Sequence, residues 1–174
     1  GAMENWMWEI AAYRLDRFLG VNMVPVTVER RFRENRGSLQ FWVEGTFHYL
    51  EIMEGRTKLP GGMKGVLFNR QVYLQRAFDD LLYNDDRHAN NILITDDWRM
   101  ILIDHSRSFR TSKASLSTLL YNEKSRTHAG TISALPAAFV EKLKTLTPEI
   151  IRGLTESYLT EKEIEAVMVR RDLI

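Results

Sequence analysis

The sequence predicts an α+β fold, in which a few short antiparallel strands combine with a larger set of helices. Two β-rich runs, residues 92–94 and 100–103, flank a short polar connection and predict a hairpin. A second pair of β-rich stretches, 21–30 and 38–45, predicts another hairpin. The C-terminal third instead has apolar residues at helical spacing. With 174 residues, 44% of them hydrophobic, the chain can bury a core as one domain or two small lobes.

Composition excludes several functional classes. The chain has 24 Lys and Arg residues and 23 Asp and Glu residues, so its net charge of +1 favours neither nucleic acid nor an anionic membrane as partner. The absence of cysteine excludes disulfides and thiolate ligands and fits a reducing, cytoplasmic compartment. No apolar run approaches the ~20 residues that a membrane helix needs. We therefore expect neither nucleic-acid binding nor an integral membrane protein.

The N-terminal part predicts a helix followed by a hairpin. Gly1-Ala2-Met3 resembles the remnant of a cleaved expression tag and is set apart from the fold. Residues 4–19 then form an amphipathic helix that ends at Gly20. Glu9 lies beside the apolar stripe of this helix, so it either points into a cleft or is an ordinary solvated glutamate. Residues 34–37 form the turn of the hairpin that follows.

Residues 54–65 are the most loop-like segment of the chain. Lys58 and Lys64 make a phosphate-binding loop conceivable, but the segment lacks the glycine spacing of known phosphate-binding motifs. We therefore expect a connector. A helix over 67–83 follows, and further helices are expected over 113–124 and in three C-terminal segments around these apolar residues: Phe139, Leu143 and Leu146; Ile150, Leu154 and Tyr158; Ile164, Val167 and Met168. Two of these begin at Thr147 and at a capping box opened by Thr160.

The functional hypothesis concerns the hairpin between residues 92 and 103. If its turn is centred between Asp97 and Trp98, Asn91 and Asp104 face each other across the two strands, with Cβ atoms roughly 5 Å apart. Magnesium takes oxygen ligands of this kind together with substrate phosphates. Asp86 lies five residues before Asn91 and can act as a base beside the metal. This is the arrangement that a kinase mechanism needs.

The motif also resembles a known family. The run Asp86-Arg87-His88-Ala89-Asn90-Asn91 is similar to the Asp-Arg-His-x-x-Asn catalytic loop of phosphoinositide lipid kinases and of secretory-pathway casein kinases. Asp104-His105-Ser106 occupies the place of the metal-binding Asp-Phe-Gly. Residues 9–25 resemble the segment that runs from the regulatory helix of these kinases into the next strand. The resemblance covers the first two thirds of the chain.

The resemblance implies a protein kinase-like fold. A partial N-lobe, the helix plus the hairpin, would occupy 4–46, and a mostly helical C-lobe would occupy 47–174. The catalytic loop would lie at 83–91 and the metal-binding segment at 104–110. The implied function is transfer of the ATP γ-phosphate to a hydroxyl group on a protein, lipid or small molecule, with Mg²⁺ or Mn²⁺. Adenylyl transfer within the same fold remains open.

The residue roles follow from the same likeness. Asp86 is the expected catalytic base, and Asn91 and Asp104 are the expected metal ligands. Arg87 and His88 either stabilise developing charge or hold the loop, and the histidine of the lipid kinase motif is thought to assist the chemistry. Either Asn91 or Asp104 by itself could be an ordinary turn residue at the end of a strand. That explanation does not account for the spacing between the two.

The nucleotide site draws on two further segments. Glu9 corresponds to the regulatory-helix glutamate that pairs with a phosphate-binding lysine. The backbone of Trp42, Val43 and Glu44 corresponds to the hinge that holds adenine, although an ordinary strand explains these side chains equally well. Because nothing upstream of the helix supplies a glycine-rich loop or a lysine strand, we expect a fragment of a longer protein, a site completed by another chain, or an inactive member.

Three alternatives stay open at this stage. Asp85 competes with Asp86 as the base, although the spacing to Asn91 favours Asp86. A zinc site built from His88, Asp104 and His105 is disfavoured, because amide and carboxylate oxygens suit magnesium or manganese better. A non-catalytic nucleotide-binding or interaction module is the alternative from another functional class.

Overall fold

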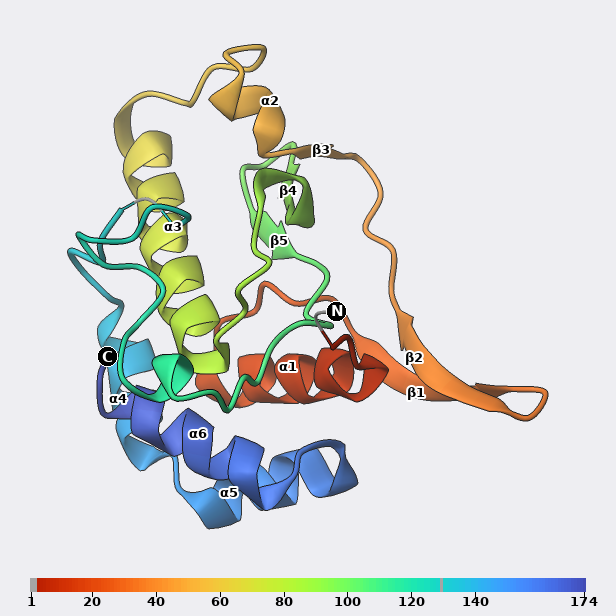
Figure 1. The fold of residues 1–174 in the computed structure, drawn as a ribbon. Coiled ribbons are helices and arrows are strands. Elements are labelled where there is room, and N and C mark those ends of the chain that lie inside the picture. The colour runs from red at the N-terminus through yellow and green to blue at the C-terminus, as the bar shows by residue number, and fades with distance from the viewer. Residues whose placement is uncertain (1–2, 129) are drawn as a thin grey trace.

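The computed structural model describes residues 3–128 and 130–174, and this part of the chain contains six α-helices and two small antiparallel sheets (Figure 1). The predicted α+β class is therefore confirmed. Gly1 and Ala2 of the predicted tag remnant, and Ala129, lie outside the described residues. The helices are α1 (Trp6–Leu19), α2 (Leu50–Met53), α3 (Gly62–Leu82), α4 (Ala137–Thr145), α5 (Pro148–Thr155) and α6 (Glu161–Arg171). The strands are β1 (Thr27–Phe32) and β2 (Asn35–Gln40), which pair with each other, and β3 (Thr46–His48), β4 (Ile92–Thr95) and β5 (Met100–Leu102), which form the second sheet in that order.

Helix α1 ends where its sequence predicts and begins slightly later, at Trp6. The Asn5 Oδ1 accepts a hydrogen bond of 2.9 Å from the Met7 backbone N–H, which satisfies one of the N-terminal donors of the helix. Gly20 follows the last turn with φ 69°, a left-handed conformation that glycine adopts at little cost, and its N–H donates to the Asp16 carbonyl. Local chemistry at both ends therefore sets the limits of this helix.

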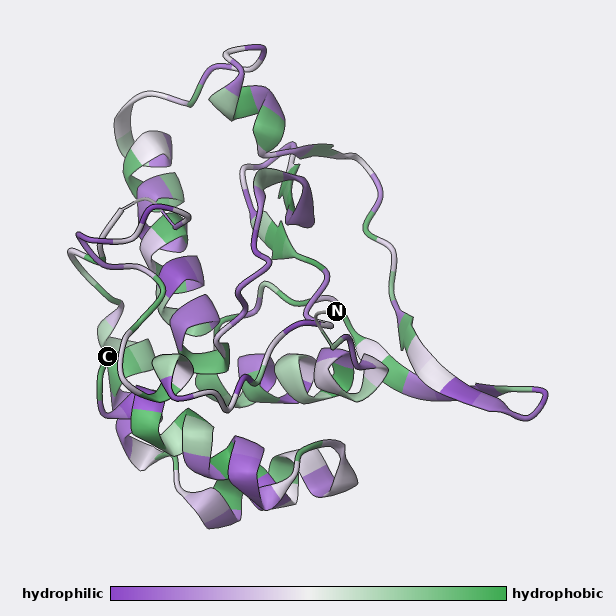
Figure 2. Cartoon of the chain, viewed as in Figure 1, coloured by the Kyte–Doolittle hydropathy of each residue, from purple (hydrophilic) through white to green (hydrophobic). Residues whose placement is uncertain are grey.

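The β1–β2 hairpin starts later than the sequence predicts. Its turn lies at Arg33 and Glu34, with Arg33 at φ 56°, so β2 already begins at Asn35. The stretch before β1 is not a strand because the buried Asp16 carboxylate binds three of its backbone N–H groups. These belong to Asn22, Met23 and Val24, at 3.0, 2.9 and 2.9 Å. The far end of the hairpin extends away from the helices and is largely hydrophilic (Figures 1 and 2).

Two other predictions are corrected. The helix expected over 113–124 is only one 3-10 turn, Ala114–Leu116. The buried Asp80 carboxylate accepts the backbone N–H groups of Leu120 and Tyr121 at 2.7 and 3.1 Å, and these donors are then unavailable to a helix. Helix α3 starts at Gly62, inside the expected loop 54–65.

The C-terminal helices form where they are expected. The Thr147 side chain caps α5 by accepting the Ile150 N–H at 3.2 Å. The capping box at the start of α6 is complete, because Thr160 and Glu163 each accept the backbone N–H of the other. Capping of this kind needs only residues close in sequence, which explains why these starts are predictable.

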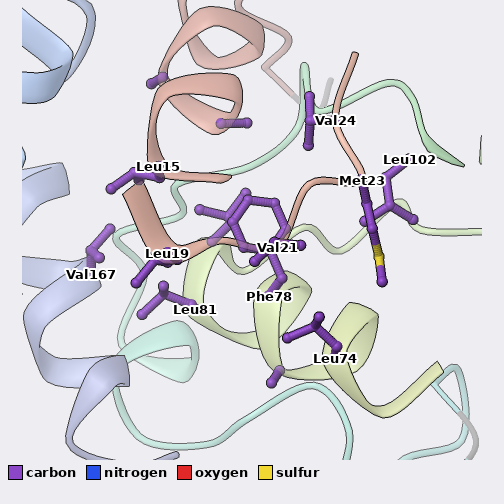
Figure 3. Packing of buried hydrophobic residues seen from close by; sticks show 14 of the residues in the cluster. Leu15, Leu19, Val21, Met23, Val24, Leu74, Phe78, Leu81, Leu102 and Val167 are labelled. Carbon is purple, nitrogen blue, oxygen red and sulfur yellow. The ribbon is translucent and has the colours of Figure 1, made fainter. Parts of the chain in front are cut away.

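One hydrophobic core connects the two ends of the chain. Leu15 and Leu19 of α1 meet Phe78 and Leu81 of α3, and Val167 of α6 packs against the same cluster (Figure 3). Helices α4 and α5 also contact α1. The first 46 residues therefore share their core with the C-terminal helices, and the division into two lobes at residue 46 stays a prediction.

Asp80 makes stability depend on pH. Burial raises the pKa of its carboxyl group from 3.8 to about 7, so between these values the native state keeps a proton that the unfolded chain has released. Stability is then lost as pH rises through this range, by about 1.4 kcal/mol per pH unit and at most about 4 kcal/mol. We expect Asp80→Asn to remove this loss, so that urea denaturation shows the variant gaining on the wild type between pH 4 and 7. Asp96→Asn, in the exposed β4–β5 loop, serves as the control. If the free energy of unfolding changed with pH in the same way for Asp80→Asn and the wild type, Asp80 would not be the group responsible.

Candidate functional site

The predicted catalytic loop begins directly after α3. Tyr83 ends the helix in a left-handed conformation, with φ 50°, and turns the chain toward β4. The buried Asn84 then connects the loop to the predicted metal-binding segment: its Oδ1 accepts the Asp86 N–H at 3.3 Å, and its Nδ2 donates to the Asp104 carbonyl at 3.3 Å. The two segments therefore lie against each other.

Arg87 is the centre of the hydrogen-bond network that holds this loop. Its side chain is 1% exposed and forms a two-pronged ion pair with the fully buried Asp79, at 2.9 Å from Nε and 3.2 Å from Nη2. Its Nη1 donates to the carbonyls of Asn91, at 2.8 Å, and Ile103, at 2.6 Å. The guanidinium group thus joins α3, the catalytic loop and the strand end that precedes Asp104. These contacts agree with the predicted role of Arg87 in holding the loop, and the other role, stabilising developing charge, stays a prediction.

A buried histidine extends this network to α1. The Arg87 Nη2 lies 2.9 Å from the His105 Nε2, and since a guanidinium has no acceptor, the ring nitrogen accepts this hydrogen bond. The His105 Nδ1 lies 3.7 Å from the Glu9 Oε2, while the Glu9 Oε1 accepts the His105 backbone N–H at 2.9 Å. Glu9, 15% exposed, therefore connects α1 to the residue after Asp104. No lysine forms an ion pair with Glu9 in the part of the chain that is described.

The two neighbouring aspartates form their shortest ion pairs with different arginines. The Asp86 Oδ1 accepts a hydrogen bond of 2.9 Å from the Arg107 Nη1. Asp85 binds Arg110 through two contacts of 3.3 Å, and its Oδ1 also lies 3.8 Å from the Arg107 Nε. Asp86 is also the member of the pair whose backbone carbonyl contacts Asn91, through the Nδ2 of that amide at 3.4 Å. The structure therefore groups Asp86, rather than Asp85, with Asn91.

The expected pairing of Asn91 with Asp104 is wrong by one residue. Ile92 pairs with Leu102, and the Ile103 N–H donates to the Asn91 carbonyl at 3.1 Å. The reason is the connection: residues 96–98 form a three-residue loop with Trp98 at φ 64°, instead of a turn with its centre between two residues. Asp104 lies one position beyond the partner of Asn91.

Asp104 is exposed and has an unusual backbone conformation. Its φ of 58° is left-handed, a conformation that is rare for residues other than glycine. Where it does occur in such residues, it is often at a functional site. The Ser106 hydroxyl donates to its Oδ1 at 2.8 Å. Among the described residues, no three His, Asp or Glu side chains gather as a metal site, so the zinc set with His88 and His105 is not formed. The expected magnesium set also includes the amide oxygen of Asn91, and this set stays a prediction.

The segment predicted as the hinge is an extended linker between β2 and β3 (Figure 1). Trp42 is 66% exposed and Glu44 is also exposed, while Val43 is half-buried. The Val43 carbonyl accepts a hydrogen bond from the Thr46 hydroxyl at 3.5 Å. A role of this backbone in holding adenine stays a prediction.

A cavity of about 430 Å³ adjoins the catalytic loop. His88 is exposed and forms part of its wall, and its Nε2 lies 3.1 Å from the Asn91 Nδ2. The cavity is also lined by residues that sequence reasoning did not single out, including Arg76, Tyr121 and His128. Burial raises the pKa of the Tyr121 hydroxyl and lowers that of the His128 ring, so both are neutral at pH 7.

Two further residues of the network carry weak sequence signals. Asp79 and Asp80 follow one another inside an apolar helix turn, and such carboxylates are rarely buried without partners. Arg107, in contrast, has nothing in its sequence surroundings that predicts its contact with Asp86.

The sequence matches no protein-family model, and no curated protein matches it. Within the described residues, no helix has both the length and the apolar character needed to cross a membrane.

Proposed function

We propose that the protein is a kinase-like phosphotransferase that moves the γ-phosphate of ATP to a hydroxyl acceptor. The observation that carries the proposal is the Arg87 network, in which one guanidinium binds the carbonyls of Asn91 and Ile103. It fixes the loop that bears Asp86 against the strand end that bears Asp104. Phosphoryl transfer depends mostly on positioning and charge stabilisation, and a rigid support of this kind serves both.

In this proposal Asp86 accepts the proton of the acceptor hydroxyl. Its Oδ1 is held by Arg107 at 2.9 Å, which fixes the orientation of the carboxylate. His88 lies two residues further along the loop, between Asn91 and the cavity, where its ring can contact the acceptor. Arg87 is a positioning residue, because its guanidinium is buried and bound to protein atoms.

Asn91 and Asp104 are the residues that would hold Mg²⁺ or Mn²⁺. The donor set fits such an ion, because hard cations prefer amide and carboxylate oxygens. The Asn91 Nδ2 donates to the Asp86 carbonyl, which fixes the amide, and Asp104 is exposed to an incoming nucleotide. A bound metal would neutralise charge on the nucleotide phosphates.

The Asp104→Ala variant tests the nucleotide site. ATP with Mg²⁺ at about 100 times its dissociation constant should stabilise the wild type by about 2.7 kcal/mol, which raises the melting temperature by roughly 5–10 °C for a chain of this size. We expect Asp104→Ala to lose most of this shift, because a carboxylate that holds the metal is gone. Asp96→Ala, an exposed carboxylate of the β4–β5 loop, is the matched control and should keep the shift. A full shift with Asp104→Ala in a thermal melt would overturn the metal assignment.

The second candidate is a non-catalytic nucleotide-binding module. Two observations favour it: the Asp86 carboxylate is ion-paired with Arg107, and the Glu9 carboxylate is bound to His105 rather than to a lysine. This module would give the thermal shift with ATP and Mg²⁺ but no phosphate transfer to any hydroxyl compound. A transfer assay alongside the melts separates the two candidates.

A further inference from the structure

The cavity beside the catalytic loop has a polar side and an apolar side. It lies between α2, α3, the catalytic loop and the segment 121–128. The apolar side includes Leu50, Met53 and Val72. The polar side includes Arg76 and His88, and no Asp or Glu lines the cavity. At about 430 Å³ its size is that of a site for a small molecule, since such sites measure roughly 300–1,000 Å³.

Arg76 supplies the charge of this cavity. The other lining arginine, Arg87, is neutralised by its ion pair with Asp79. Arg76 forms no ion pair with a carboxylate in the described part of the chain, and its Nη1 donates to the Thr131 carbonyl at 2.8 Å. Its guanidinium also lies 5.8 Å from the centre of the Tyr73 ring and 5.7 Å from that of Tyr121. A fixed cation without a counter-charge favours an anionic ligand.

The Arg76 guanidinium lies against the backbone at Gly130. A Cβ atom at Gly130 would lie 2.5 Å from three atoms of this guanidinium, so a larger residue there would displace the end of the arginine side chain. The hydrogen bond to Thr131 and the two tyrosine rings hold the guanidinium in this place before any ligand arrives, which lowers the entropic cost of binding.

We propose that this cavity binds the acceptor, and that the acceptor is an alcohol with an anionic phosphate group. The phosphate binds Arg76, the carbon skeleton contacts Leu50, Met53 and Val72, and the hydroxyl points past His88 toward Asp86. This proposal rests on the proposed function for the hydroxyl, but the binding of the anion does not depend on catalysis. The ligand is either a free phosphorylated alcohol or a lipid headgroup, because both carry the same chemistry.

Calorimetric titration without ATP tests the binding. The probes are glycerol 1-phosphate, inorganic phosphate and glycerol, with phosphatidylglycerol vesicles as the lipid source. We expect glycerol 1-phosphate or the vesicles to bind, and glycerol not to bind. Inorganic phosphate should bind more weakly than whichever of glycerol 1-phosphate and the vesicles binds more tightly. Binding to the soluble probe alone identifies a free metabolite as the source, and binding to the vesicles alone identifies a lipid headgroup.

Two variants locate the site. Arg76→Gln keeps a donor for Thr131 but removes the charge, and should weaken binding about tenfold or more, as expected when a charge-assisted hydrogen bond is lost. Val72→Trp fills the apolar side and should also prevent binding while Arg76 is retained. Arg70→Gln, an exposed arginine on the same helix, is the control and should bind as the wild type does. Circular dichroism confirms that each variant is folded.

The outcomes separate this inference from the proposed function. Unchanged affinity in both Arg76→Gln and Val72→Trp, equal binding of glycerol, or no binding of any phosphorylated probe would overturn the cavity assignment. Phosphate transfer to an acceptor without an anionic group would also overturn it, while the proposed function would stand. Binding that follows the expected pattern without phosphate transfer would support the cavity and remove the proposed function.

Discussion

Replacing Asp86 by Asn is expected to lower the rate of phosphate transfer by about 10²–10⁴-fold, because a positioned general base contributes about that much to a transfer step. Asn keeps the size of the side chain and can still accept a hydrogen bond from Arg107, so the fold of the loop should persist. Nucleotide affinity should change little, since Asp86 acts on the acceptor hydroxyl. The measurement is the single-turnover rate of γ-phosphate transfer from ATP, together with ATP affinity from a binding titration.

Asp85 provides the control for this experiment. It is adjacent in sequence, it carries the same charge, and it binds Arg110 through two contacts of 3.3 Å. Asp85→Asn therefore removes a comparable ion pair and leaves the 2.9 Å contact between Asp86 and Arg107 in place, although the Asp85 Oδ1 also lies 3.8 Å from the Arg107 Nε. We expect its transfer rate to stay within a few-fold of the wild type. Equal losses in the two variants, or a normal rate in Asp86→Asn, would reject Asp86 as the base.

Replacing Arg87 by Met should destabilise the protein by about 3–5 kcal/mol, the usual cost of leaving one partner of a buried ion pair without its counter-charge. Asp79 would remain fully buried without its counter-charge, the Ile103 carbonyl would lose the Arg87 donor, and the Asn91 carbonyl would keep only the Ile103 N–H. Because a domain is stable by only about 5–15 kcal/mol, this loss removes a large part of the total. Urea denaturation at pH 7 measures it directly.

Two comparisons make this prediction specific. Arg99→Met breaks an ion pair with Asp97 in which both side chains are about two-thirds exposed, and it should have a much smaller effect. The double variant with Asp79→Leu and Arg87→Met removes both charges and should recover part of the lost stability, since no unpaired charge remains buried. A loss in Arg87→Met no greater than that in Arg99→Met would show that the pair does not hold the loop.

Elements that depend on neighbouring residues followed from the sequence. The end of α1 at Gly20 and the capping box at Thr160 need hydrogen bonds only within about four positions. The β4–β5 hairpin followed from its apolar runs and polar connection. Even so, its register was missed, because a three-residue loop and a two-residue turn differ by one position and give the same apolar pattern.

Elements that depend on distant side chains did not follow from the sequence. Asp16 binds the N–H groups of Met23 and Val24 and so prevents a strand, and Asp80 binds those of Leu120 and Tyr121 and so prevents a helix. Local propensity favours a strand in the first case and a helix in the second. A buried carboxyl group overrides it, because a polar group without hydrogen bonds is costly to bury.

The sequence by itself determined the end of α1, the starts of α5 and α6, the presence of the two hairpins and the spacing from Asp86 to Asn91, because these are properties of the chain over short distances. Only the tertiary structure decided that Arg87 pairs with Asp79, that Glu9 binds His105 and that Arg107 holds Asp86. Each of these contacts joins groups from different elements, and burial makes each depend on its partner. The position of Arg76 in the cavity wall is also decided by the tertiary structure. Its guanidinium contacts Gly130, which lies far from it in the sequence.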